Sequence, residues 1–179
     1  MIESTKIVLL SGRGKRFKDR GYIHPKGLLK LNNQELAFLS ANSLPNCKDT
    51  IFGIQKKDSL KYDFKRIKNK NYNKNSKIYE FDDYTNGQAT SCFQILENNK
   101  ILTDSFFVLS CDFSFEINKK LSNKFLKQID AIVFTYKAKN YNFENSTSYG
   151  WIRSNKENMV LDVSCKKSFK ATKGNEHII

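Results

Sequence analysis

Short apolar runs alternate with segments of helical periodicity along most of this chain. The apolar, β-branched runs predict strands, and segments whose apolar residues recur three and four positions apart predict helices. The expected strands are 5–10, 50–55, 77–81, 105–113, 130–138, 148–154 and 158–165. The expected helices are 34–44, 59–68, 87–99 and 118–129, and 68–76 is expected to be an exposed loop.

Strands that are separated by helices predict a mainly parallel, mixed sheet with helices on both faces. The fold class expected is therefore a Rossmann-like three-layer α/β/α arrangement, and the 179 residues are expected to form a single domain, 1–179. Ligands of such sheets bind beyond the carboxyl ends of the strands. Two places there carry polar chemistry, namely the loop after 5–10 and Asp112 at the end of 105–113.

The formal net charge of +13 indicates an anionic ligand or a basic solvated surface. Much of the lysine is interleaved with asparagine, as in "KRIKNKNYNKNSK", and no nucleic-acid-binding motif accompanies it, so nucleic-acid binding ranks last. No run is long enough to predict a membrane span, and the N-terminus lacks the pattern of a signal peptide. The four cysteines are dispersed without metal spacing, which favours reduced thiols and a cytoplasmic protein.

The basic loop after the first strand, "SGRGKRFKDRGYIHPK", is suited to phosphate. Gly12 and Gly14 let successive N–H groups face one anion, while Arg13 and Arg16 can each donate two hydrogen bonds to phosphate oxygens. Lys26, after a proline that stiffens its approach, offers a compact charge to a second phosphate. A flexible basic surface loop is the alternative interpretation.

The stretch "VLLSGRGKRFKDRGYIHPKGLLKLNNQEL" resembles the signature of nucleotidyltransferases that join an NTP to a sugar 1-phosphate or a similar phosphorylated metabolite and release pyrophosphate. Its form is most similar to the branch of capsule and surface-polysaccharide synthesis. The matching positions are Gly12, Gly14, Arg16, Phe17, Pro25, Lys26 and Leu28. The resemblance implies that Gly12, Arg13, Gly14 and Lys15 bind the nucleotide phosphates, and that Arg16 and Lys26 are catalytic, Lys26 at the α-phosphate.

Three later segments are similar to the same family in order and spacing. "TNGQATSCFQI" resembles the segment that reads the nucleobase, which implies that Gly87 and Gln88 bind nucleotide. "FFVLSCDFSF" resembles the strand that delivers a metal-binding aspartate, which implies Mg²⁺ on Asp112. "SYGWIRSNKENMVLDVSCKK" resembles the strand pair before a lysine that contacts the acceptor, here Lys166. The alternative for Asp112 is a residue that caps a turn, although the apolar run before it and its place at the ligand edge of the sheet favour the metal role. The alternative for Lys166 is an ordinary basic tail.

The sequence departs from the family's pattern at several points. Gly27 stands where Pro or Ala is usual, 32–34 replaces a G-x-P turn, and Cys165 occupies a Glu position. The family's pattern continues past the point where this sequence stops and supplies a second metal-binding aspartate there. Two interpretations follow: a shortened member that binds Mg-NTP with slow or absent transfer, or a member whose second metal ligand comes from elsewhere. Fast transfer would favour the second, with Asp162 as the candidate ligand.

The expected function is transfer of an NMP from Mg-NTP, with CTP, UTP or dTTP as the donor, to a phosphorylated small-molecule acceptor. Sugar 1-phosphates and non-sugar phosphates of the phosphocholine kind both remain open as acceptors. The expected partners are these small molecules, without nucleic acid and without membrane insertion, and the sequence leaves a homo-oligomer open. The alternative function is a catalytically impaired module of the same fold that binds nucleotide or a protein.

Overall fold

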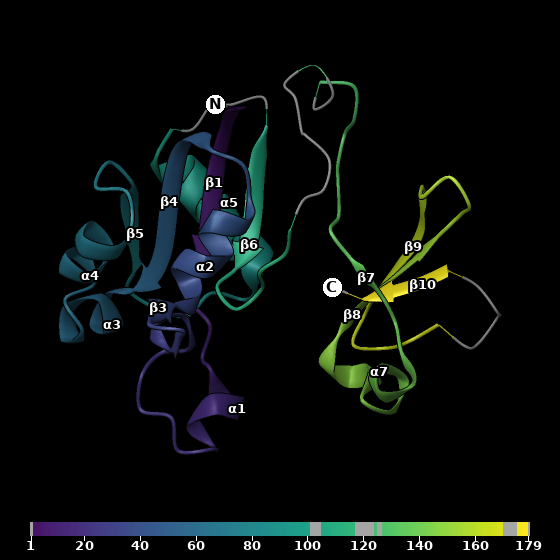
Figure 1. Cartoon of the computed structure of the whole chain (residues 1–179), viewed down its shortest axis with the longest axis horizontal. Coiled ribbons are helices and arrows are strands. Elements are labelled where there is room, and N and C mark those ends of the chain that lie inside the picture. Colours follow the sequence, from purple (N-terminus) through teal and green to yellow (C-terminus); the bar gives the residue numbers. More distant parts are fainter. Residues whose placement is uncertain (1, 101–104, 117–123, 125–126, 170–174, 179) are drawn as a thin grey trace. The chain divides into compact units, whose positions relative to one another are not determined.

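The computed structural model describes residues 2–100, 105–116, 124, 127–169 and 175–178. The chain divides into two compact units, which we call unit 1 (Met1–Gln128) and unit 2 (Ile129–Ile179) (Figure 1). Each unit is described by itself, and the expectation of a single domain over 1–179 stays a prediction. Within the described residues, no helix is long and apolar enough to span a membrane.

The centre of unit 1 is a parallel sheet of four strands. They are β1 (Ile2–Leu9), β4 (Cys47–Gln55), β5 (Lys77–Phe81) and β6 (Phe106–Ser110), in the order β5-β4-β1-β6. β1 pairs with β4 on one side and with β6 on the other. The residues from Ser4 to Leu10 are all buried, as expected for a central parallel strand covered on both faces.

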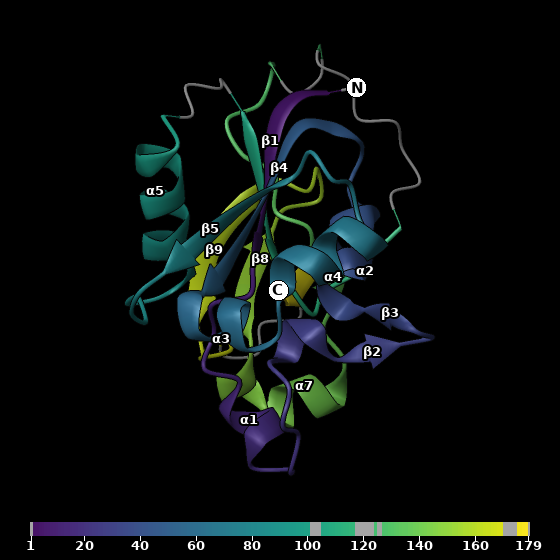
Figure 2. The ribbon, with the colours of Figure 1, turned by 90° about the vertical axis from the view of Figure 1, so that its left-hand side faces the viewer.

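Helices cover both faces of this sheet, which confirms the predicted α/β/α class (Figure 2). α2 (Leu36–Ser43) and α4 (Phe64–Asn71) lie on one face, and α5 (Gln88–Asn98) lies on the other. The first face carries an aromatic cluster, in which the Phe38 ring packs edge-on against Phe52 with centroids 5.6 Å apart. On the α5 face the core consists of Ile7, Leu9, Ile51, Phe81, Cys92 and Ile95.

Three shorter elements complete the edge of the sheet where the strands end. They are α1 (Lys15–Lys18), the 3₁₀ turn η1 (Lys26–Leu28) and α3 (Lys56–Lys61). A hairpin of β2 (Lys30–Leu31) and β3 (Gln34–Glu35) follows η1. Its turn residues Asn32 and Asn33 have φ of 50° and 64°. Asparagine tolerates this left-handed region, which explains how the hairpin closes without glycine.

The structure corrects the helix expected over 59–68 and the loop expected over 68–76. Asp63 adopts φ 47° and separates α3 from α4, and its side chain accepts a hydrogen bond from the backbone N–H of Arg66, which caps α4. α4 then continues to Asn71. Lys68, within the expected loop, is buried and donates to the carbonyls of Lys74 and Ser76 at 3.0 and 2.6 Å. Burial lowers the pKa of Lys68 from its ordinary value, with a further contribution from Lys65.

A second correction concerns the strand expected over 130–138. Only Tyr136–Lys137 (β7) forms a strand there, and Ile132 and Val133 are 37% and 43% exposed. The propensity of an apolar run for a strand depends on its partners in the fold, and within the described residues only 136–137 of this run pair with another strand, β10 (Asn175–Ile178). Most of the helix expected over 118–129 lies outside the described residues.

Unit 2 is built on an antiparallel sheet. Its strands are β7, β8 (Gly150–Ser154), β9 (Val160–Cys165) and β10 (Asn175–Ile178), in the order β7-β10-β8-β9. β8 and β9 confirm the strands expected at 148–154 and 158–165, whereas β10 was not predicted. α7 (Asn140–Glu144) and the turn η2 (Ser146–Ser148) precede β8. Trp151 is fully buried, and its indole N–H donates to the Ser146 carbonyl at 2.9 Å.

Candidate functional site

The parallel register of unit 1 places the polar loops after β1 and β6 next to each other. Leu9 pairs with Gly53 of β4 and with Ser110 of β6. Beyond the strands, the Leu10 N–H donates to the Gly53 carbonyl at 2.7 Å, and the Cys111 N–H donates to the Leu9 carbonyl at 3.3 Å. The residues that follow β1 and β6 therefore begin side by side at the carboxyl edge of the sheet, which is the usual ligand-binding edge of such folds.

A pocket of about 150 Å³ opens at this edge, and we call it the strand-end pocket. Its lining comes from the ends of β1 and β6, from η1 and from the start of α5. The lining residues are Leu9, Leu10, Ser11, Gly12, Arg13, Lys26, Tyr84, Thr85, Gly87, Gln88, Ser91, Ser110 and Cys111. Five of the residues singled out in the sequence thus meet in one place, although they are separated by up to 76 positions along the chain, from Gly12 to Gln88.

An ion pair joins Lys26 of this pocket to Asp112, with Nζ and Oδ1 2.9 Å apart. The side chains are 25% and 36% exposed, and the Ser110 hydroxyl donates to the same carboxylate oxygen. Burial would raise the pKa of Asp112, but the hydrogen bond from Ser110 and the pairing with Lys26 outweigh it, so the pKa lies below its ordinary value. A fixed positive and a fixed negative charge therefore stand together at the strand ends.

Gly27 allows Lys26 to approach the strand ends so closely. A Cβ at position 27 would lie 2.8 Å from Leu10 Cδ2, closer than real Cβ contacts, and 3.2 Å from Cys111 Cβ, which is a tight contact. A residue larger than glycine would therefore require these neighbours to shift. Burial raises the pKa of the neighbouring Cys111 to about 12, so its thiol stays protonated and does not act as a nucleophile at neutral pH.

Hydrogen bonds from buried side chains hold the walls of the pocket. Gln55 at the end of β4 is buried, and its amide donates to the carbonyls of Ser11 and Asp83 at 3.4 and 3.3 Å, which ties two pocket loops together. Ser91 in the first turn of α5 donates to the Gly87 carbonyl at 3.2 Å. Such supports keep polar loops in place before any ligand arrives.

The amino end of α5 supplies hydrogen-bond donors at the pocket. Gly87 is the N-cap with φ 129°, a conformation that favours glycine. The first N–H groups of a helix have no partner within it, and they carry the positive end of the helix dipole. Gly87 and Gln88 therefore present backbone donors suited to carbonyl or phosphate oxygens.

Tyr84, which the sequence did not single out, has a ring that contacts two cations. The Arg13 guanidinium is 5.2 Å from the ring centroid and the Lys57 ammonium is 4.5 Å from it. Cation–π contacts of this kind hold a flexible arginine in a defined place. The available signal was position alone, because Tyr84 immediately precedes the segment "TNGQ" that the resemblance had singled out.

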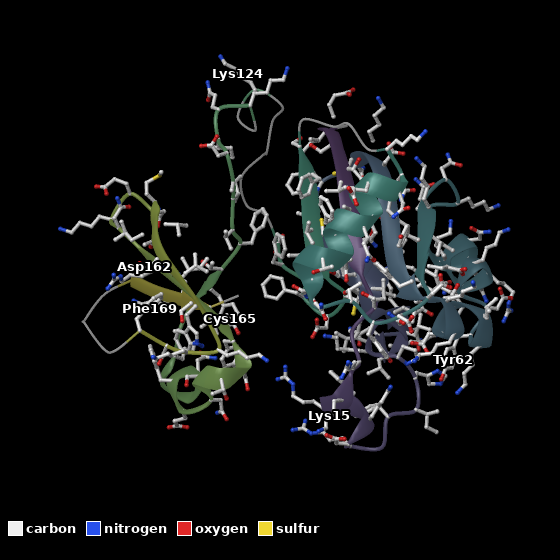
Figure 3. The ribbon with its side chains drawn as sticks, turned by 180° about the vertical axis from the view of Figure 1, so that it is seen from behind. Lys15, Tyr62, Lys124, Asp162, Cys165 and Phe169 are labelled. Carbon is white, nitrogen blue, oxygen red and sulfur yellow. The ribbon has the colours of Figure 1, made fainter. Side chains whose placement is uncertain are left out.

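The other candidate residues lie outside the lining of this pocket. Gly14, with φ 61°, is the N-cap of α1, which carries Lys15 and Arg16 as exposed side chains. Figure 3 shows Lys15 on α1. Lys166 belongs to unit 2, where it has φ 58° and its N–H donates to the Tyr149 carbonyl at 2.9 Å. The roles implied for these four residues stay predictions.

The described residues contain no group of three or more His, Cys, Asp or Glu side chains arranged to hold a metal ion. Mg²⁺ in phosphate-transfer sites needs fewer protein ligands than that, because one or two carboxylates, water and the substrate's phosphates complete its coordination shell. The ionised Asp112 at the pocket fits this requirement as a single protein ligand, with Lys26 as its partner when no cation is bound.

No protein-family model and no curated protein matches this sequence. Solved structures do match the fold. The chain is similar to the nucleoside-diphosphate-sugar pyrophosphorylase from Vibrio cholerae RC9, with 17% identity and a TM-score of 0.65 over 96% of this chain and 72% of that one. The chain is also similar to the inositol-1-phosphate CTP transferase from T. maritima, with 17% identity and a TM-score of 0.65 over 99% of this chain and 69% of that one.

A third similar structure is a UDP-glucose pyrophosphorylase in complex with UDP-glucose, with 18% identity and a TM-score of 0.69 over 100% of this chain and 74% of that one. The three relatives share an α/β architecture with this chain. At such low identity, this likeness establishes the fold class of the chain.

Proposed function

We propose that this protein is a nucleotidyltransferase that moves an NMP from an NTP to a phosphorylated small molecule and releases pyrophosphate. The observation that carries the proposal is the strand-end pocket, where Lys26 pairs with Asp112 beside Gly12, Arg13 and the amino end of α5. These groups are cationic or are hydrogen-bond donors, apart from one carboxylate. That balance suits a triphosphate with a divalent cation.

In the proposed reaction, a phosphate oxygen of the acceptor attacks the α-phosphorus of the NTP and forms a new P–O bond. The bond from the α-phosphorus to the oxygen that bridges to the β-phosphorus breaks, and pyrophosphate leaves with that oxygen and its electron pair. The reaction requires no covalent protein nucleophile, so catalysis consists of positioning and charge stabilisation.

The residues have separate roles in this scheme. The N–H groups at Gly12 and the Arg13 guanidinium bind the phosphates, and Lys26 stabilises the negative charge that develops at the α-phosphate. Gly87 and Gln88 bind the base through backbone donors. Asp112 would hold Mg²⁺, which supplies charge neutralisation when bound. Arg16 on α1 and Lys166 in unit 2 are proposed to contact the phosphates and the acceptor.

The finer parts of the proposal concern the substrates and their setting. We propose CTP, UTP or dTTP as the donor, and a sugar 1-phosphate or a phosphocholine-like molecule as the acceptor, in the synthesis of surface-polysaccharide precursors in the cytoplasm. The inositol-1-phosphate CTP transferase and the UDP-glucose pyrophosphorylase support both kinds of acceptor by likeness of fold. All four cysteines are free, which agrees with a reducing compartment.

The test is a matrix of each NTP against a panel of phosphorylated metabolites with Mg²⁺, followed by release of pyrophosphate and by mass spectrometry of the nucleotide product. One combination should give pyrophosphate and an NDP-linked product in equal amounts, and chelation of the metal should stop both. If nucleotides bind but no combination yields product, the binding-module alternative is correct. If no nucleotide binds, the proposal is wrong.

A further inference from the structure

A second and larger cavity lies in unit 1, beside α4, and the proposed reaction makes no use of it. Its volume is about 520 Å³, within the range of small-molecule sites. It is lined by His24, Leu28, Leu29, Lys30, Glu35, Tyr62, Arg66, Ile67, Lys70 and Asn71. We call it the α4 cavity. Tyr62, at the carboxyl end of α3, is labelled in Figure 3.

The α4 cavity and the strand-end pocket have separate linings. The two linings share no residue. Both include one residue of the turn η1, which is Lys26 for the strand-end pocket and Leu28 for the α4 cavity. A ligand of one site therefore contacts a different set of side chains from a ligand of the other. Variants can be chosen that affect one site alone.

The α4 cavity has a floor that is polar and structurally fixed. Glu35 is 3% exposed, and the amide of Asn71 donates to both of its carboxylate oxygens at 3.2 Å. Lys30 lies 3.5 Å from Oε1 of the same carboxylate. A carboxylate offers about four acceptor positions, so Glu35 can still accept a hydrogen bond from a ligand in the cavity.

The rim of the cavity is predominantly basic. Lys30, Arg66 and Lys70 line it, against Glu35 as the single acidic lining residue. Lys30 is paired with Glu35 and Arg66 with Asp63. Among the residues that the structure describes, no carboxylate lies within ion-pair distance of Lys70. The surplus positive charge favours an anion at the rim.

The walls between the rim and the floor are apolar. Leu28, Leu29 and Ile67 contribute aliphatic surface, and Tyr62 contributes an aromatic ring. That ring is held in place, because the Tyr62 hydroxyl donates to the Ile23 carbonyl at 3.1 Å and the His24 ring lies 5.1 Å from it. A fixed ring and branched side chains suit a flat or aliphatic body, which a bare inorganic anion lacks.

We propose that the α4 cavity is a second ligand site, which binds a small organic phosphate monoester with an apolar, ring-sized body. The phosphate lies at the rim beside Lys70 and Arg66, and the body lies against Leu28, Ile67 and Tyr62. A phosphate is favoured over a carboxylate because its additional charge and oxygen can meet Lys70 and Arg66 at the same time. This site is independent of whether the strand-end pocket performs nucleotidyl transfer.

The experiment titrates the ¹⁵N-labelled full chain with phenyl phosphate, inorganic phosphate, phenol and benzoate, and follows assigned backbone amides. The amides of Leu29, Lys30 and Asn71 report the α4 cavity, and those of Gly12 and Gln88 report the strand-end pocket. Phenyl phosphate should shift the cavity amides with an affinity about tenfold or more above that of each other probe, because ring and dianion both contribute.

The matched variants are Lys70→Gln and Lys65→Gln. Both remove one exposed lysine from α4, but only Lys70 lines the cavity. Lys70→Gln should weaken phenyl phosphate about three- to fivefold, as expected for a partly exposed ion pair, while Lys65→Gln leaves the affinity within about 1.5-fold.

Three results would overturn the proposal. Shifts confined to Gly12 and Gln88 would place the anion in the strand-end pocket alone. Equal effects of the two lysine variants would mean attraction to the overall charge of α4. Tighter binding of benzoate than of phenyl phosphate would make the ligand class a carboxylate. Lys26→Ala removes a side chain that lines the strand-end pocket and not the α4 cavity. If phenyl phosphate still shifts the cavity amides in that variant, the second ligand site stands whether or not the proposed function is correct.

Discussion

Units 1 and 2 bury their strands in opposite ways. In unit 1 the central strand β1 is enclosed by two neighbouring strands and by helices on both faces, and Ile7 and Val8 are fully buried. In unit 2, β9 is an edge strand whose Leu161 and Val163 are 58% and 66% exposed. Both strands are apolar, but β1 is covered along both edges and on both faces, whereas β9 has one unpaired edge and exposed side chains.

This difference determines where a ready-made site forms within each unit. Parallel strands end at one edge, so the loops that follow them converge, and unit 1 thereby collects residues from four separate segments into the strand-end pocket. In an antiparallel sheet successive strands end at opposite edges, and loops from neighbouring strands do not converge in this way. We therefore expect nucleotide binding to depend on the packing of unit 1 and to tolerate damage to the core of unit 2.

Trp151→Ala is the strongest test of that separation. Trp151 is fully buried and packs against Phe143 with ring centroids 5.0 Å apart, so its truncation should cost unit 2 about 3–5 kcal/mol. Limited proteolysis with mass spectrometry should show much faster cleavage within 129–169. Calorimetry should show nucleotide binding unchanged within about twofold, because every residue lining the strand-end pocket belongs to unit 1.

Two further variants control this experiment. Val163→Ala removes an exposed side chain from unit 2 and should leave proteolysis nearly unchanged. Phe52→Ala removes a fully buried ring from unit 1 and should abolish nucleotide binding while it opens that unit. Loss of nucleotide binding in Trp151→Ala would show that the two units do not function separately.

Lys26→Ala should cause the largest loss of turnover among the pocket variants. The removal of one preorganised donor at a developing negative charge typically costs on the order of 100- to 1,000-fold in kcat. Lys18→Ala is the matched control, because it removes an exposed lysine of α1 that does not line the pocket. Pyrophosphate release gives kcat for both, and equal turnover in the two variants would mean that Lys26 has only a structural role.

Asp112→Asn should raise the Mg²⁺ concentration needed for half-maximal activity at least about tenfold, because an amide keeps the shape but lacks the charge that a hard cation requires. Stability supplies a second measurement. Since the pKa of Asp112 is lowered in the folded state, its stabilising contribution exists above the unfolded-state pKa of about 3.9 and is lost as the pH falls.

Acid unfolding therefore distinguishes the wild type from the variant. The stability advantage of the wild type should shrink below about pH 4, whereas Asp112→Asn has no carboxyl group to protonate there. A variant that loses stability at neutral pH but keeps the wild-type Mg²⁺ dependence would identify Asp112 as a structural residue that pairs with Lys26.

Gly27→Ala probes the close packing that brings Lys26 to the strand ends. The added methyl would contact the buried Leu10 and Cys111, and such overpacking typically costs about 1–3 kcal/mol of stability. Gly12→Ala is the matched control for stability alone, because a Cβ at position 12 meets no atom within 4 Å. Thermal unfolding of both variants measures the difference, and equal midpoints would contradict the tight packing at position 27.

The contrast between the units also explains what the sequence could predict. β5 was predicted at its true bounds and α5 within one residue at each end, whereas β1 and β4 begin three residues before the predicted strands; apolar strand runs and amphipathic helices carry strong local patterns. The strand expected at 130–138 failed because its apolar run is exposed within unit 2, and β10 was missed because four residues carry too little pattern. Local pattern therefore predicts an element best where the run is several residues long and pairs with neighbouring strands, as in β5 and β9.

The candidate site was predictable where a residue follows a strand or begins a helix. Gly12 and Asp112 were singled out because they follow strands, Lys26 as part of the basic loop and Gly87 through the resemblance, and the structure brings all four to one edge of the sheet. Gln55 and Tyr84 were not found, because their roles depend on contacts between loops that lie far apart in the sequence. The α4 cavity was missed for the same reason, since Glu35 and Asn71 meet only in the folded chain.

Lys166→Ala should have the smallest effect, and it tests whether unit 2 contributes to the reaction at all. The resemblance assigns Lys166 to the acceptor, and an exposed lysine that pairs with a phosphate is worth up to about 1 kcal/mol, or about fivefold in KM. The KM for the acceptor should therefore rise up to about fivefold, with kcat and the KM for the NTP unchanged. The backbone of Lys166 has φ 58°, but lysine and alanine share the strain of that conformation, so the substitution isolates the side chain. Lys167→Ala removes the neighbouring exposed lysine and should change neither constant. Equal KM values for Lys166→Ala and Lys167→Ala would confine the reaction to the residues of unit 1.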